Sequence, residues 1–108
     1  FRSATKAAGE MPVPYFPNIT MGWDSSPRTV QSDVFDMWRY PFMATIGNNT
    51  PEAFEQGCRA VRDWLDMHPD LPRIVTVNSW NEWTEGSYLE PDEKHGMAYL
   101  EALGRVFE

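Results

Sequence analysis

The sequence predicts an α/β fold, in which strands and helices alternate along the chain. A run of β-branched residues from Ile74 to Val77 is typical of a strand buried on both faces, as in a parallel sheet covered by helices. Helical patterns over 50–67 and 97–107 each follow a segment that suits a strand. The predicted order is strand, excursion, helix, strand, loop, helix, which is the order of an α/β sheet.

The first strand is expected in the proline-rich and aromatic segment 12–23. Its prolines limit regular pairing to the later part of this segment. Residues 1–11 are small and polar, and they predict the tail of a helix that closes at Gly9. Residues 24–28 predict a loop. Residues 30–46 predict a long excursion with one short helix, of the kind that covers a cleft.

The first complete helix has a predicted start and a predicted end. Thr50 suits the N-cap position, Pro51 the first helical position, and Glu52 the positive end of the helix dipole. Pro69 disfavours helical geometry in the residue before it, so the helix should stop near Met67. Its buried face is predicted from helical spacing to consist of Phe54, Cys58, Val61 and Leu65. The last helix, over 97–107, is expected to bury Met97, Leu100 and Leu103.

Composition excludes some classes of partner. The chain has 16 acidic and 9 basic side chains, giving a net charge of −7, which argues against nucleic acid and anionic membrane surfaces. No apolar run reaches the roughly 20 residues that span a membrane. Five Trp, four Tyr and six Phe suit either a dry core or a sugar cleft. The single cysteine, Cys58, forms no internal disulfide and is expected to be inert core.

Polar residues crowd the C-terminal end of the second predicted strand. Glu82 and Glu85 follow this strand, whereas Asp24 and Arg28 follow the first. Ligands of α/β folds bind at the C-terminal ends of strands, so both groups should lie at one edge of the sheet. Glycoside hydrolysis commonly uses two carboxyl groups. Glu82 and Glu85 share a cleft only if the chain turns between them, and one of them should then hold its proton to higher pH.

Further side chains near this edge suit sugar binding. Aromatic rings contact the apolar faces of sugars, and amides or carboxylates bind hydroxyls. The candidate substrate-binding residues, which accompany the candidate catalytic pair Glu82 and Glu85, are Asp24, Arg28, Trp80, Asn81, Trp83, Tyr88 and Glu90. Arg28 either pairs with Asp24 or orients a carboxylate.

Structural explanations compete with each of these functional ones. Two glutamates in a loop are more often a solvated surface, and Trp80 and Trp83 are more often core than platform. Asp24 and Arg28 are more often a loop salt bridge. No His/Cys cluster has metal-ligand spacing and no phosphate loop is present, so no cofactor is expected. The sequence does not assign a cellular compartment, although it slightly favours a periplasmic or secreted location.

The motif W-N-E-W-T-E-G-S-Y-L-E-P-D, over 80–92, resembles glycoside hydrolase family 99-like proteins. This group includes WbsX-like proteins, often labelled glycosyltransferases or lipopolysaccharide biosynthesis proteins. The following H-G-M-A-Y-L-E-A-L and the upstream G-W-D-S-S-P-R also resemble the family, so the resemblance covers about 21–103. It implies a (β/α)8 barrel, which needs about 250 residues. Residues 1–108 would be the C-terminal part of one such domain, with the remaining barrel on a missing segment or another chain.

The resemblance also implies a chemistry and a carbohydrate substrate. In the related endo-α-mannosidases the first glutamate of the motif is a base on the substrate 2-hydroxyl and the second is the general acid and then base, which retains configuration. Matched by motif, Glu82 would be the base and Glu85 the acid/base. Thr84 stands where the mannosidases have His, which implies another sugar or another chemistry. Two further classes stay open: a glycosyltransferase in polysaccharide synthesis, and a non-catalytic carbohydrate-binding protein.

Overall fold

The computed structural model describes residues 13–30 and 39–108. The predicted helix tail at Gly9 and residues 31–38 of the predicted excursion therefore lie outside the described residues. Strands, helices and two single turns of 3-10 helix occur in the order β1 (Asn18–Thr20), η1 (Ser26–Arg28), α2 (Pro51–Asp66), β2 (Thr76–Asn78), β3 (Asn81–Glu82), η2 (Trp83–Glu85), β4 (Ser87–Tyr88) and α3 (Ala98–Phe107).

The strands β1 and β2 pair in parallel, with α2 between them in the chain. Asn18 lies opposite Thr76, and Thr20 lies opposite Asn78. The Asn18 amide also donates a hydrogen bond of 2.8 Å to the Thr76 hydroxyl. This β-α-β unit followed by α3 confirms the predicted α/β class. The described residues do not close a barrel, so the barrel stays a prediction.

The predicted boundaries of α2 are confirmed. Thr50 is the N-cap, and its hydroxyl accepts a hydrogen bond of 3.2 Å from the Ala53 amide. Pro51 occupies the first turn, where its missing N–H leaves no hydrogen bond unmade. The helix ends at Asp66, one residue before the predicted stop. All of its predicted face is buried, together with Pro51 and Trp64.

The buried face of α3 differs from the prediction. Tyr99, Ala102 and Val106 are buried, whereas Met97 is 51% exposed. The aromatic ring of Tyr99 decides the rotation, because it packs edge-on against Phe54 with ring centroids 5.6 Å apart. Its hydroxyl donates a hydrogen bond of 2.8 Å to the Asn49 carbonyl. Leu100 and Leu103 lie at the margin of the core, half-buried.

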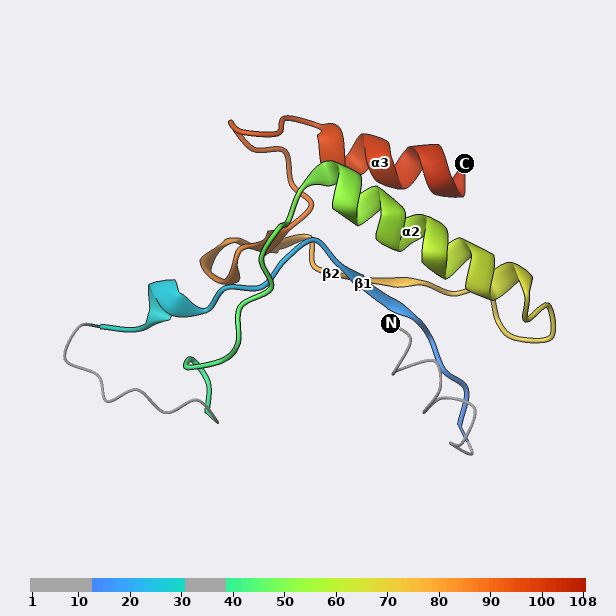
Figure 1. Ribbon diagram of the computed structural model, residues 1–108, viewed down its shortest axis with the longest axis horizontal. Helices are drawn as coiled ribbons and strands as arrows, with labels where there is room; N and C mark the ends of the chain where they lie inside the picture. Colours follow the sequence, from blue (N-terminus) through green and yellow to red (C-terminus); the bar gives the residue numbers. More distant parts are fainter. Residues whose placement is uncertain (1–12, 31–38) are drawn as a thin grey trace.

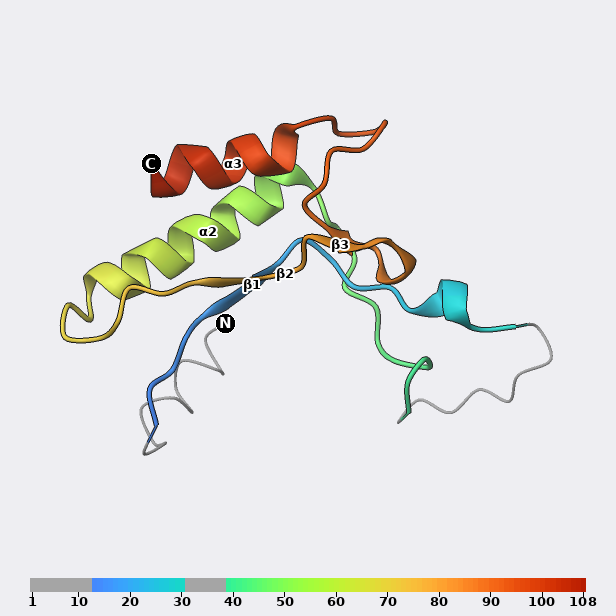
Figure 2. The same cartoon turned by 180° about the vertical axis from the view of Figure 1, so that it is seen from behind.

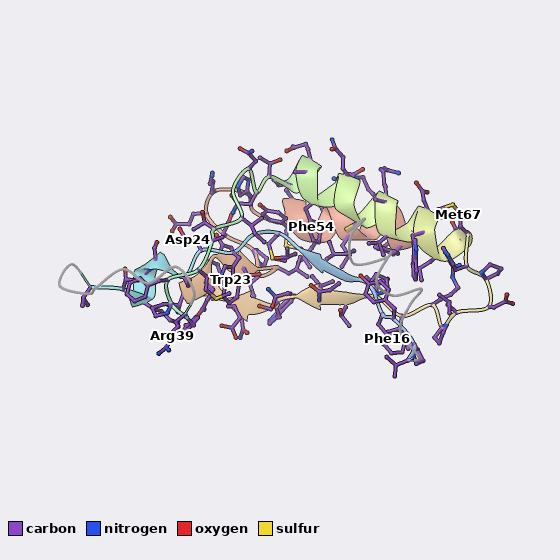
Figure 3. All side chains as sticks on the ribbon, turned by 60° about the horizontal axis from the view of Figure 1, so that its bottom comes forward. Phe16, Trp23, Asp24, Arg39, Phe54 and Met67 are labelled. Carbon is purple, nitrogen blue, oxygen red and sulfur yellow. The ribbon has the colours of Figure 1, made fainter. Side chains whose placement is uncertain are left out.

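The helices cover only one side of the strand pair. Both α2 and α3 lie on the same side of β1 and β2 in Figures 1 and 2. Phe54 lies between α2 and the strands, whereas Phe16 lies at the opposite end of the molecule from Trp23 and Asp24 (Figure 3). The prediction that Ile74 to Val77 is buried on both faces is wrong here. Ile74 is 51% exposed, because the described residues place no second helical layer on that face.

The described residues are spread more widely than a compact domain. The radius of gyration is 15.8 Å, against about 13 Å expected for a globular domain of this length. The bare strand face and the segment 39–46, which runs away from the helices in Figure 1, account for this shape. Within the described part of the chain, neither helix has the length and apolar character needed to cross a bilayer.

Candidate active site

A hairpin follows β2 and carries both predicted carboxylates. β3 and β4 pair antiparallel, with Glu82 opposite Ser87, and the 3-10 turn η2 joins them. Gly86 closes the turn with φ of 60°, a left-handed conformation that favours glycine. The chain thus reverses between Glu82 and Glu85, which is the turn that the prediction of a shared cleft required.

Ser87 anchors the hairpin to the end of β2. This fully buried residue donates a hydrogen bond of 2.6 Å to the Asn78 backbone carbonyl and accepts one of 3.1 Å from the Asn78 side-chain Nδ2. Ser79 adds a bond of 2.9 Å to the Ser87 carbonyl. Asn78 therefore helps to hold the hairpin against the end of β2.

The segment after β1 binds to the same hairpin. The Asp24 amide donates a hydrogen bond of 2.7 Å to the Glu85 carbonyl, and the Arg28 guanidinium donates through Nε to Glu85 Oε1. The Asp24 carboxylate accepts a hydrogen bond of 2.9 Å from the Ser26 amide, and Ser26 also lowers the pKa of Asp24. Of the two roles predicted for Arg28, the structure shows the second, in which it orients a carboxylate. The C-terminal ends of β1 and β2 meet as predicted.

A third residue, Tyr40, also holds Glu85. Its hydroxyl donates a hydrogen bond of 2.8 Å to Glu85 Oε1. Two hydrogen bonds fix the segment that carries Tyr40. The Ser25 hydroxyl donates to the Pro41 carbonyl, and the Ile46 backbone amide donates one of 2.8 Å to the Trp23 backbone carbonyl. Tyr40 is not among the predicted site residues, because no spacing in the sequence relates it to the motif. The one available signal was its place in an excursion predicted to cover a cleft.

These contacts determine the charge of Glu85. The residue is only 4% exposed, yet its pKa is lowered, chiefly by the hydrogen bond from Arg28 and then by that from Tyr40. Burial opposes this shift. The lowered pKa favours the ionised form of Glu85.

Glu85 keeps one oxygen without a partner. Oε1 receives Arg28 and Tyr40, whereas Oε2 is buried and makes no hydrogen bond among the described residues. The indole N–H of Trp23 is also buried and makes no hydrogen bond among the described residues. A buried, unpaired carboxylate oxygen is costly, so such atoms are common where a ligand or a mobile proton completes the site.

The predicted aromatic residues lie at the surface of the hairpin. Trp80 is 53% exposed and Trp83 is 46% exposed, so neither is core within the described residues. The Trp83 ring stacks on Tyr88 with centroids 3.8 Å apart and planes 16° apart. Its indole N–H donates a hydrogen bond of 2.6 Å to Glu90. Trp83 is therefore a fixed aromatic surface beside Glu82.

The two remaining candidates, Asn81 and Glu82, are both exposed on β3. Asp92 accepts hydrogen bonds from the Tyr88 hydroxyl and the His95 amide, so it organises the loop before α3. Over 13–30 and 39–108, no group of three or more His, Cys, Asp or Glu side chains is placed to hold a metal ion.

The parallel pair, the carboxylate hairpin and the arginine beside it define an α/β protein with a polar site at its strand ends. A family model described as "Glycosyltransferase WbsX" matches residues 2–103. The chain therefore belongs to the WbsX family of carbohydrate-active proteins, and the resemblance based on the 80–92 motif is confirmed.

Two similar proteins come from strains of Xanthomonas campestris pv. campestris. Both are named "Uncharacterized protein WxcX" and are 33% identical to the chain over 95 residues. These alignments include 81% of the chain, which spans 11% of the length of these curated relatives. No solved structure matches the chain.

Proposed function

We propose that the chain carries the catalytic carboxylates of a retaining glycoside hydrolase that acts on oligo- or polysaccharides. Glu82 and Glu85 are the pair in this proposal. The observation that carries it is the binding of Glu85 by Arg28 and Tyr40, which come from outside the hairpin. A glutamate with no role beyond solvating the surface would be exposed, whereas Glu85 is buried and accepts hydrogen bonds from two other segments.

The roles follow the family resemblance. Glu82 takes the proton of the substrate 2-hydroxyl, and that oxygen attacks the anomeric carbon. Glu85 gives a proton to the leaving oxygen and later takes one from water. The ionised state of Glu85 suits the second of these steps. The first step requires Glu85 to be protonated, which weakens its ion pair with Arg28.

The exposed aromatic rings support a carbohydrate substrate. Trp83 is held by Tyr88 on one face and by Glu90 at its N–H, so it loses little freedom when a sugar binds. Trp80 is exposed at the other end of β3. Asp24, Arg28 and Asn81 complete the proposed sugar site, and the −7 net charge suits a neutral ligand.

The alternative is a glycosyltransferase of polysaccharide biosynthesis. The description of the matched family favours it, because that description names a glycosyltransferase. Transfer from an activated donor would use the same hairpin, with Glu82 or Glu85 as the base that activates the acceptor hydroxyl. A non-catalytic carbohydrate-binding protein would need the aromatic surface but not the charges on the two glutamates.

The test compares the intact protein with its Glu82→Gln and Glu85→Gln variants. Each is incubated with mannose- and glucose-containing oligosaccharides, and released sugar is measured by chromatography, with the anomeric configuration followed by NMR. We expect retained configuration, and turnover at least about a thousandfold lower in both variants. Glu93→Gln, an exposed change outside the site, is the matched control and should leave turnover unchanged.

Each other result points elsewhere. Turnover that survives in both variants would place the chemistry on other residues. Transfer from a sugar nucleotide to an acceptor, without hydrolysis, would favour the glycosyltransferase. Sugar binding without turnover, unchanged in both variants, would identify a binding protein.

A further inference from the structure

Tyr40 contacts Glu85, but the reaction steps proposed above give it no chemical task. Its ring is half exposed, but its hydroxyl reaches inward to Glu85 Oε1. Arg28 donates to the same oxygen. A carboxylate oxygen offers two lone pairs, so these two donors fill Oε1. Oε2 is left buried and unpaired.

We propose that Tyr40 is a positioning residue for Glu85, which acts with Arg28 to hold the Glu85 carboxylate in one fixed orientation. This inference rests on the proposed function for its chemical step. In that step the proton leaves the Glu85 carboxyl group for the glycosidic oxygen as the bond to the anomeric carbon breaks. In the second step, the Glu85 carboxylate takes a proton from the attacking water.

The position of Tyr40 is well defined by its neighbours. Pro41 follows it, and the Pro41 carbonyl accepts a hydrogen bond from Ser25, which is 1% exposed. The hydroxyl therefore arrives at Glu85 from a segment fixed to the loop after β1. A tyrosine hydroxyl is neutral near pH 7, so it fixes the carboxylate without adding charge, whereas Arg28 supplies the charge.

The groups that face Glu85 are Arg28 from η1, Tyr40 from the segment 39–46, and Glu82 from β3. Arg28 and Tyr40 both favour the ionised form of Glu85. Removing the Tyr40 hydroxyl should therefore raise the pKa of Glu85. The limb of a pH–rate profile that reports Glu85 then moves to higher pH, whether Glu85 acts as acid or as base.

The experiment uses the Tyr40→Phe variant of the intact protein, which keeps the ring and removes only the hydroxyl. Tyr15→Phe is the control, because Tyr15 packs edge-on against Trp64, away from the site. We expect kcat to fall about ten- to a hundredfold in Tyr40→Phe with KM little changed, the size of one lost hydrogen bond to a charged group. The Glu85 limb should move to higher pH, and Tyr15→Phe should match the wild type.

A second readout does not depend on turnover. Infrared difference spectra over a pH titration contain a carboxyl band that is absent from Glu85→Gln and so belongs to Glu85. We expect the midpoint of this band at higher pH in Tyr40→Phe than in the wild type. An unchanged midpoint would overturn the role of Tyr40, even if the protein is a glycosidase. A shifted midpoint in a protein without hydrolytic turnover would uphold the positioning contact and reject the proposed function.

Discussion

The two ends of the molecule are held together by different forces. At the helical end, apolar side chains of α2 and α3 pack on one another and on β1. At the site end lie Ser25, Glu85 and Ser87, which are the only buried polar side chains in the described part of the chain, and each has named partners. Apolar packing tolerates small shifts, whereas a buried polar group depends on partners at hydrogen-bond distance.

This difference separates stability from function. Burial of apolar area provides most of the free energy that holds α2 and α3, and it requires no particular charge. The site end provides little apolar area but fixes a carboxylate, an arginine and a tyrosine. We therefore expect substitutions at the helical end to change the free energy of unfolding, and substitutions at the site end to change activity or pH dependence.

The largest expected loss of stability comes from Phe54→Ala. Phe54 is 3% exposed and packs on Tyr99, so truncation leaves a cavity between α2 and α3. We expect a loss of about 3–5 kcal/mol. Hydrogen exchange of residues 51–66 in the intact protein, measured by mass spectrometry, would report it. Gln56→Ala, exposed on the same helix, is the control, and equal protection in the two variants would contradict the distinction between the two ends.

A smaller loss is expected from Thr50→Ala at the start of α2. The Thr50 hydroxyl is the acceptor for the Ala53 amide, and its removal leaves that amide without its cap. We expect a loss of about 1 kcal/mol. Exchange of the Ala53 amide should rise in this variant, whereas Thr50→Ser, which keeps the hydroxyl, should stay close to the wild type. A larger loss in Thr50→Ser than in Thr50→Ala would reject the capping role.

The smallest expected effect is a pH dependence at the site end. The pKa of Glu85 is lowered in the folded state, so its contacts stabilise the hairpin above the ordinary glutamate pKa of about 4.3. This stabilisation is lost as pH falls through the lowered pKa, because protonation removes the charge that Arg28 binds. Arg28 is 44% exposed, so solvent weakens the pair.

Exchange of residues 81–88 at pH 6 and pH 3 would measure this effect. The protection lost between the two pH values should be greater in the wild type than in Glu85→Gln, which has no carboxyl at this position. Equal losses in the two proteins would show that Glu85 does not link the hairpin to pH.

The sequence predicted features that depend on local chemistry. Thr50, Pro51 and Pro69 act on their own neighbours in the chain. The start and end of α2 could therefore be predicted to within one residue. The alternation of strand and helix predicted the parallel pair, and the turn between Glu82 and Glu85 was the stated condition for a shared cleft. The motif over 80–92 predicted the family. These signals are short-range, or belong to one continuous stretch.

Features that depend on distant contacts were not predicted. The face of α3 depends on Tyr99 meeting Phe54 and Asn49, and leucine spacing alone selected another face. Tyr40 reaches Glu85 across 45 positions of sequence. The expected burial of Ile74 on both faces assumed a second layer that the described residues do not supply. Each of these outcomes is decided by what lies across the fold.

The hydrogen bond from the Asp24 amide to the Glu85 carbonyl joins main chain to main chain. Almost any residue can donate or accept there, so the bond itself places no demand on the side chains at these two positions. It does fix how much chain lies between Thr20 and Asp24, and between Asn78 and Glu85. The lengths of the two loops are therefore tied to one another, and a single inserted residue in either loop would move Arg28 away from Glu85.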